Sequence, residues 1–119
     1  MSPPYPRALS PTEFKLADWL LEHSTQLHAD EKKKFRSQLN EALVVSRCGC
    51  GCATIEFSIA GQKSATGGLR PLSESATRNN EFGIFIYETG GLLSGLEIYG
   101  LANLNLPSEF PALSEIEIK

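Results

Sequence analysis

The chain has 119 residues, 41% of them hydrophobic and 21% charged, and its 14 acidic and 11 basic residues give a net charge of −3. This length and composition suit one globular domain with its own core, so we expect a single domain over residues 1–119. The acidic balance argues against nucleic acid as a partner, because binding to the phosphate backbone depends on an excess of Lys and Arg.

No apolar run reaches the roughly 18 residues that a membrane span needs, and no signal-peptide core follows Met1. An odd number of cysteines, three, without a secretion signal is typical of a reducing compartment. We therefore expect no membrane partner and a cytoplasmic location.

The N-terminal part of the chain carries helix signals. Residues 1–9 are rich in proline and predict an extended lead-in. Ser10, Pro11 and Glu13 form the start of a helix, with a capping box and a proline at the first helical position. This helix should end near Ser24, and its apolar arc consists of Phe14, Leu16, Ala17, Leu20 and Leu21. A second helix is predicted over residues 30–43, with a narrower apolar stripe.

From residue 43 onward the hydrophobic period changes from 3.6 to 2, which is typical of strands. Strands are predicted at 43–47, 53–59, 82–87 and 92–99, with a short edge strand at 115–119. Gly90 and Gly91 mark a tight hairpin. Residues 61–81 are polar and rich in Gly, Ser and Thr, and we expect a long loop that is either functional or mobile.

These elements predict an α+β fold in which two N-terminal helices pack on a small, mainly antiparallel sheet of four to five strands. The other face of the sheet should be partly solvated or used for binding. Its expected residues are Thr54, Glu56, Ser58, Glu97 and Tyr99.

All three cysteines, Cys48, Cys50 and Cys52, lie in one short segment between two predicted strands. In an extended strand their side chains would share one face, with Cα atoms about 6.5–7 Å apart, which is too far for one metal ion unless Gly49 and Gly51 bend the backbone. The spacing also differs from the usual zinc pattern of paired cysteines. Buried thiols in a tight turn are therefore the favoured interpretation, and a zinc site or a thiol-redox centre is the alternative.

A histidine could complete such a zinc site only if the fold brings it close. His23 borders the apolar arc of the first helix, and His28 precedes the second helix. Neither has a nucleophile or carboxylate at a motif spacing, so packing or surface roles are the simpler interpretation for both.

Arg47 and Glu97 are the lone charges in otherwise apolar strand segments. A charge in such a place needs a partner or water, so they could form a structural ion pair or lie on the solvent face. Together with Tyr99 they are the candidate binding residues. A weaker hypothesis makes Arg47, Glu97 and Tyr99 the lining of an enzyme pocket under residues 61–81. No motif for a nucleophile, a zinc protease or a phosphate loop is present, so the chain gives no support for an enzyme.

Residues 47–54 (RCGCGCAT) and 91–100 (GLLSGLEIYG) resemble a family of small uncharacterised bacterial proteins, a domain of unknown function with a C-x-C-G-C segment and a C-terminal hairpin. Some members look like immunity-type partners of secreted toxins. The resemblance implies no catalytic residues.

The sequence as a whole favours a non-enzymatic protein-binding module that acts without a cofactor, either an immunity-like partner or a small homodimer. The alternative is a metal-binding or thiol-redox protein that uses Cys48, Cys50 and Cys52, with zinc as the metal.

Overall fold

The computed structural model describes residues 5–63 and 68–119. Along the chain the elements are β1 (Arg7–Ala8), α1 (Pro11–Glu22), α2 (Ala29–Leu39), β2 (Ala42–Arg47), β3 (Ile55–Ile59), β4 (Gln62–Lys63), β5 (Arg70–Thr77), β6 (Phe82–Thr89), β7 (Leu92–Gly100), the 3₁₀ turn η1 (Leu113–Glu115) and β8 (Ile116–Ile118). None of the helices in this part of the chain has both the length and the apolar content that crossing a bilayer requires.

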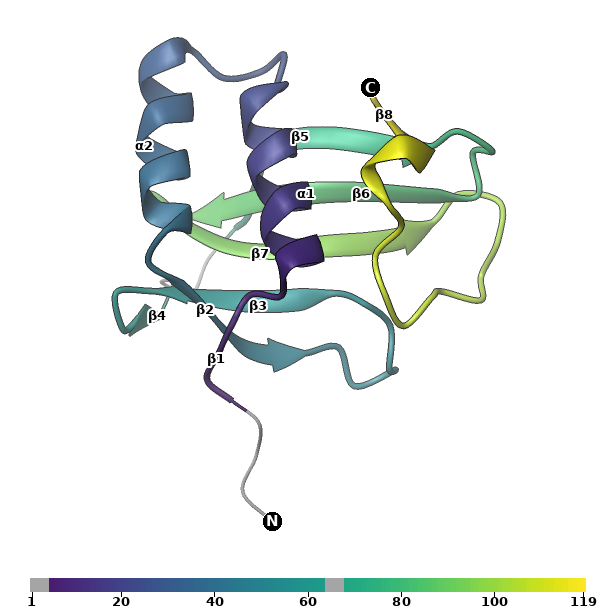
Figure 1. The fold of residues 1–119 in the computed structure, drawn as a ribbon, viewed down its shortest axis with the longest axis horizontal. Helices are drawn as coiled ribbons and strands as arrows, with labels where there is room; N and C mark the ends of the chain where they lie inside the picture. The colour runs from purple at the N-terminus through teal and green to yellow at the C-terminus, as the bar shows by residue number, and fades with distance from the viewer. Residues whose placement is uncertain (1–4, 64–67) are drawn as a thin grey trace.

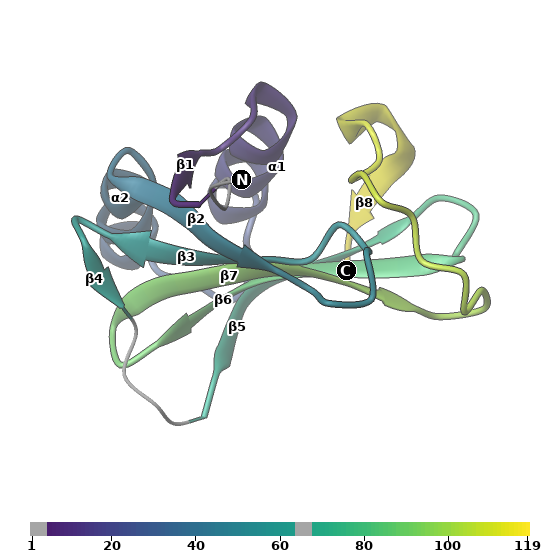
Figure 2. The ribbon, with the colours of Figure 1, turned by 90° about the horizontal axis from the view of Figure 1, so that it is seen from below.

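One antiparallel sheet runs through the molecule in the order β1-β2-β3-β7-β6-β5-β8, and the two-residue strand β4 pairs with β3 outside this path. Both helices lie on the same side of the sheet (Figures 1 and 2). The predicted α+β class, with the helices at the N-terminus, is therefore confirmed. The predicted number of four to five strands is wrong, because seven strands lie on this path.

The region predicted as a loop at 61–81 contains β5, one of the long strands of the sheet. Its serines and threonines suggested a loop, but Ser73, Ser75 and Thr77 are buried in the folded sheet. The Ser75 hydroxyl donates to the carbonyl of Ile84 on the neighbouring strand at 3.1 Å, which satisfies its polarity. Four residues of that region, 64–67, lie outside the described chain. The lead-in prediction for 1–9 is likewise modified, because Arg7 and Ala8 pair with β2.

α1 begins as the sequence predicts. The Ser10 hydroxyl accepts from the Glu13 amide, and the Glu13 carboxylate accepts from the Ser10 amide at 2.8 Å. Most of the predicted apolar arc is buried, although Phe14 keeps 37% of its surface exposed. α2 ends at Leu39 rather than at residue 43, because Ala42 already belongs to β2 and pairs with Ile59.

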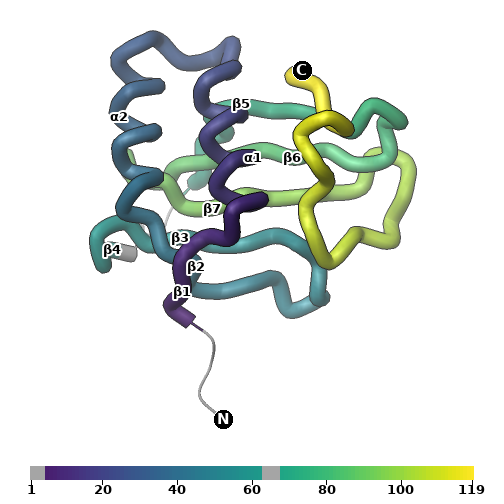
Figure 3. The backbone as a smooth tube through the Cα atoms, in the orientation of Figure 1, coloured from purple at the N-terminus to yellow at the C-terminus, as the bar shows by residue number. Residues whose placement is uncertain are grey.

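The core lies between the helices and the face of the sheet that they cover. It combines the arc of α1 with apolar side chains from α2 and the central strands: Leu16, Leu20, Leu21, Phe35, Leu39, Ile55, Ile84, Ile86, Leu96 and Ile98. The β6–β7 hairpin turns at Gly90 and Gly91, whose φ angles of 62° and 89° confirm the predicted glycine turn. After β7 the chain crosses back over the helix side of the sheet to place β8 beside β5 (Figures 2 and 3).

Candidate functional site

The face of the sheet that turns away from the helices carries a cluster of aromatic and acidic side chains, which we call the open face. Its residues follow from the strand register, which sets Glu56, Gly95 and Tyr87 in one row across the sheet. Glu97, Phe85 and Glu74 form the next row, and Tyr99, Gly83 and Ala76 form a third. The open face thus consists of Glu56, Glu74, Ala76, Gly83, Phe85, Tyr87, Gly95, Glu97 and Tyr99.

Three aromatic rings form the centre of the open face. The ring centroid of Phe85 lies 5.7 Å from that of Tyr87 and 5.8 Å from that of Tyr99, both in tilted arrangements. The two tyrosine rings lie against glycines on the neighbouring strand, Tyr87 over Gly95 and Tyr99 over Gly83. All three rings are half-buried, so part of each remains available to a partner.

Carboxylates surround these rings. Glu56 is exposed, whereas Glu74 and Glu97 are half-buried, and burial raises the pKa of Glu97. Burial, together with the negative charges of Glu56 and Glu97, raises the pKa of Tyr87 to about 12. Burial and the charges of Glu74 and Glu97 also raise the pKa of Tyr99. None of these nine residues is basic, so the centre of the open face combines an aromatic surface with negative charge. At its β8 edge the next carboxylate in the third row, Glu117, is paired with Arg78.

Sequence reasoning found part of this face. It placed Glu56, Glu97 and Tyr99 together on the side of the sheet away from the helices, and the structure does so. It missed Phe85 and Tyr87, because residues 82–87 are apolar on both faces of the predicted strand and so do not distinguish the covered side from the open side. The alternation of Ile84 and Ile86 with these two rings was the signal that could have found them.

Arg47 does not belong to the open face. Its register partner is Ile55, which points into the core, so Arg47 lies on the helix side while Glu97 lies on the opposite side. The hypothesis of an Arg47–Glu97 ion pair is therefore wrong, and so is a pocket that Arg47, Glu97 and Tyr99 line together. Arg47 instead donates from Nη2 to the carbonyl of Cys52 at 3.2 Å and to the carbonyl of Ser108 at 2.6 Å.

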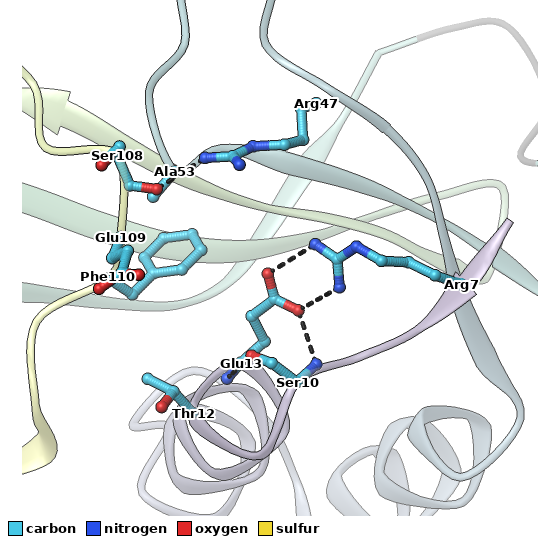
Figure 4. A pocket seen from close by; sticks show the side chains of 9 residues that line it. All are labelled: Arg7, Ser10, Thr12, Glu13, Arg47, Ala53, Ser108, Glu109 and Phe110. Carbon is cyan, nitrogen blue, oxygen red and sulfur yellow. Dashed lines mark hydrogen bonds and ion pairs between the residues drawn. The ribbon is translucent and has the colours of Figure 1, made fainter. Parts of the chain in front are cut away.

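A cavity of about 360 Å³ lies beside Arg47 on the helix side, between the start of α1 and the segment before η1 (Figure 4). Arg7 and Glu13 form a two-pronged ion pair in it, with distances of 2.8 and 3.0 Å. Burial would raise the pKa of Glu13, but the hydrogen bonds from Arg7 and from the Ser10 amide outweigh it and lower that pKa. Because Arg7 and Glu13 satisfy each other's charge, we assign this cavity a structural role.

The three cysteines converge in the turn between β2 and β3. The Cys48 and Cys50 sulfurs are 2.9 Å apart, and all three sulfurs lie within 4.8 Å of one another. Cys52 is buried, Cys48 is half-buried and Cys50 is exposed. The favoured prediction of three buried thiols is therefore wrong for two of them, and the bend that a shared site would need is present.

Backbone contacts hold this turn in place. Gly51 has a φ of 88°, which reverses the chain, and its amide donates to the carbonyl of Cys48 at 3.1 Å. The amide of Ala53 donates to Pro107, so the turn is fastened to the C-terminal segment. His23 and His28 do not join the cysteines: the His23 ring contacts the carbonyl of Trp19, and His28 caps α2.

Comparison of the chain with protein-family models, with curated proteins and with solved structures yields no match. The resemblance of residues 47–54 and 91–100 to small bacterial proteins therefore stays a prediction.

Proposed function

We propose that the protein is a non-enzymatic protein-binding module whose open face binds a basic segment of a protein partner. The observation that carries this proposal is that a half-buried aromatic cluster and carboxylates lie together on a sheet face that neither α1 nor α2 covers (Figure 2). Aromatic residues dominate the centres of protein interfaces, where they supply a large contact area at low conformational cost.

The chemistry of the open face selects for arginine in the partner. A guanidinium stacks on a tyrosine or phenylalanine ring and at the same time donates hydrogen bonds to a carboxylate beside it. Phe85 lies directly between Glu97 and Glu74 in the cross-strand row, so a group stacked on its ring would have a carboxylate on either side. Lysine, a point charge without a planar face, should bind there less well.

Charge also argues against a second copy of this chain as the occupant. A face-to-face dimer through the open face would bring Glu56, Glu74 and Glu97 of both copies together, and like charges across an interface oppose association. An immunity-type role, which the predicted resemblance implies, would agree with a basic partner.

The test is an NMR titration of the ¹⁵N-labelled protein with a hexa-arginine peptide, and with hexa-lysine and hexa-glutamate for comparison. Hexa-arginine should shift amide signals in β3, β6 and β7, bind more tightly than hexa-lysine, and lose affinity as salt is added. Hexa-glutamate should cause no shifts. Glu97→Gln and Phe85→Leu should each weaken hexa-arginine binding about two- to fivefold, as expected for one charge or one cation–π contact.

Glu22→Gln is the matched control, because it removes the same charge from the exposed surface of α1. The proposal is wrong if Glu22→Gln weakens binding as much as Glu97→Gln does, or if the shifted signals lie on the helices. Open-face signals that broaden with protein concentration, without any peptide, would identify a second copy as the occupant and would also overturn it.

A further inference from the structure

We infer that Cys48, Cys50 and Cys52 form a three-thiolate site for a soft monovalent metal cation, Cu⁺. This inference is independent of the open face, because the cysteine turn lies at the end of β2 and β3 and shares no residue with it. It rests on the convergence of three sulfurs from five consecutive residues.

The spacing of the sulfurs suits one metal ion. Two sulfurs that bind a common ion at about 2.3 Å lie about 3.8 Å apart in a tetrahedral site and about 4.0 Å apart in a trigonal one. The separations in the turn start at 2.9 Å for Cys48 and Cys50 and stay within 4.8 Å for all three, so they bracket both values. Small rotations about the side-chain bonds would equalise them.

The number of ligands favours Cu⁺ over Zn²⁺. Within the described chain, the group of possible ligands consists of the three cysteines and includes no histidine or carboxylate. Thiolates select Cu⁺ and Zn²⁺ among the common metals. Zinc sites in proteins are almost always four-coordinate, so zinc would need a water or an outside ligand here. Cu⁺ is satisfied by three sulfurs in a plane.

The surroundings of the turn suit negatively charged sulfurs. Binding of Cu⁺ by three thiols releases three protons and leaves a complex with a charge of −2. The Cys52 amide donates to the Cys50 sulfur at 3.4 Å, and the Arg47 guanidinium is held beside the turn by the Cys52 carbonyl. Both contacts place positive charge or a donor where the complex would carry negative charge.

The three cysteines differ in their exposure to solvent, and this difference suits reversible binding of a metal ion. Cys52 is 4% exposed and packs in the core, whereas Cys50 is exposed on the outside of the turn. A metal ion could therefore enter through Cys50 and be held by the two inner sulfurs. The same exposure lets a partner thiol reach the metal and remove it.

The experiment is an anaerobic titration of the reduced full-length protein with Cu⁺ against a chromophoric Cu⁺ chelator, with a parallel titration with Zn²⁺. We expect one Cu⁺ per chain, a thiolate-to-metal charge-transfer absorption, and protection of the thiols from alkylation. Cys50→Ser should reduce Cu⁺ affinity at least tenfold without unfolding the protein, because this side chain is exposed.

Two glycine variants separate the geometry of the turn from the mere presence of thiols. Gly51→Ala keeps all three sulfurs but strains the turn at its positive φ, so it should reduce Cu⁺ affinity about tenfold. Gly49→Ala is the matched control, because an added Cβ meets nothing within 4 Å, and it should bind as the parent protein does.

Three results would overturn the inference. The first is the absence of a charge-transfer band with Cu⁺, and the second is equal Cu⁺ affinity in the parent protein and in Cys50→Ser. The third is Zn²⁺ binding in preference to Cu⁺, which would show that a fourth ligand completes the site.

Discussion

The ring of Tyr99 lies directly over Gly83, its cross-strand partner on β6. A Cβ at Gly83 would come within 2.7 Å of the Tyr99 Cε1 atom and closer still to Cζ. The absence of a side chain at Gly83 is therefore what lets the ring lie flat on the sheet. Tyr87 and Gly95 repeat the arrangement on the same pair of strands, in the opposite direction.

Gly83→Ala should destabilise the protein by about 1–2 kcal/mol, because the new methyl group displaces the Tyr99 ring. In a Tyr99→Ala background the same substitution should cost much less, since the three atoms nearest to the added Cβ all belong to the Tyr99 side chain. Urea unfolding of the two single variants and the double variant gives the coupling energy. A coupling near zero would contradict the close packing of the ring on Gly83.

Gly95→Ala should behave differently from Gly83→Ala. Its added Cβ would meet the Tyr87 ring but also the backbone carbonyl of Ile55, at 2.7 Å. A backbone atom cannot move aside as a side chain can, so the loss of stability should persist, at about 1–3 kcal/mol, in a Tyr87→Ala background. The same urea experiment checks this, and full rescue by Tyr87→Ala would contradict it.

Tyr87 should ionise at a pH well above that of an ordinary tyrosine. Burial and the charges of Glu56 and Glu97 raise its pKa to about 12, from a usual value of 10.0. A spectrophotometric titration of the phenolate absorption, with Tyr87→Phe to assign the step, measures this value. Glu56→Gln should move the step to lower pH, because one of the repelling charges is gone. A step near 10 in the parent protein would contradict the burial of this ring among carboxylates.

Glu97→Gln should stabilise the protein at neutral pH, by about 0.5 kcal/mol or less. Burial raises the pKa of Glu97 in the folded state, so the ionised carboxylate opposes folding at pH values above its raised pKa. Below the ordinary pKa of 4.5 the carboxyl is protonated in both states and the advantage of the variant should vanish. Thermal unfolding from pH 4 to pH 8 tests this. A residue that weakens the fold and yet lies at the centre of the open face fits a role in binding.

The helical half of the fold was predictable because its signals are local. The capping box at Ser10 and Glu13 and the apolar arc of α1 depend only on neighbours in the chain. The hairpin at Gly90 and Gly91 is local in the same sense. The strand β5 was not predictable, because the buried hydroxyl of Ser75 becomes acceptable only when the Ile84 carbonyl of β6 is there to accept from it.

The candidate sites also combine features that local sequence predicts with features that depend on the tertiary structure. The alternation of Glu97 and Tyr99 in β7 predicted their common face, but the partner strands that add Phe85 and Glu74 depend on sheet order, which the sequence does not encode locally. The convergence of the cysteine sulfurs depends on the positive φ of Gly51. A Gly in the sequence permits this angle without requiring it, so the sequence favoured a tight turn but did not show that the three sulfurs converge.

We expect the hydrogen bonds of Arg47 to hold the cysteine turn in position. Its Nη2 atom joins the carbonyls of Cys52 and Ser108, two segments far apart in the chain. Arg47→Ala should destabilise the protein by about 1 kcal/mol, because both carbonyls lose a charged donor. Hydrogen exchange should then speed up at the Ala53 amide, which donates to the Pro107 carbonyl beside the same cavity as Arg47. Unchanged exchange at Ala53 would show that Arg47 does not hold the turn.

Glu13 and Glu97 should respond to acid in opposite ways. Hydrogen bonds from Arg7 and Ser10 outweigh the effect of burial and lower the pKa of Glu13, so its carboxylate stabilises the fold above the ordinary pKa of 4.5. That stabilisation is lost as the pH falls through the lowered pKa. Glu13→Gln should therefore destabilise the protein at pH 7, by about 1 kcal/mol, the usual size of a helix-cap effect.

The measurement is thermal unfolding of Glu13→Gln, Glu97→Gln and the surface control Glu22→Gln across the same pH range. At neutral pH Glu13→Gln should unfold at a lower temperature than the parent protein, and Glu97→Gln at a higher one. Both differences should shrink as the pH falls. Glu22→Gln should follow the parent protein throughout. Parallel curves for Glu13→Gln and Glu97→Gln would mean that the half-buried ion pair of Arg7 and Glu13 and the carboxylate on the open face do not differ in environment, contrary to the structure.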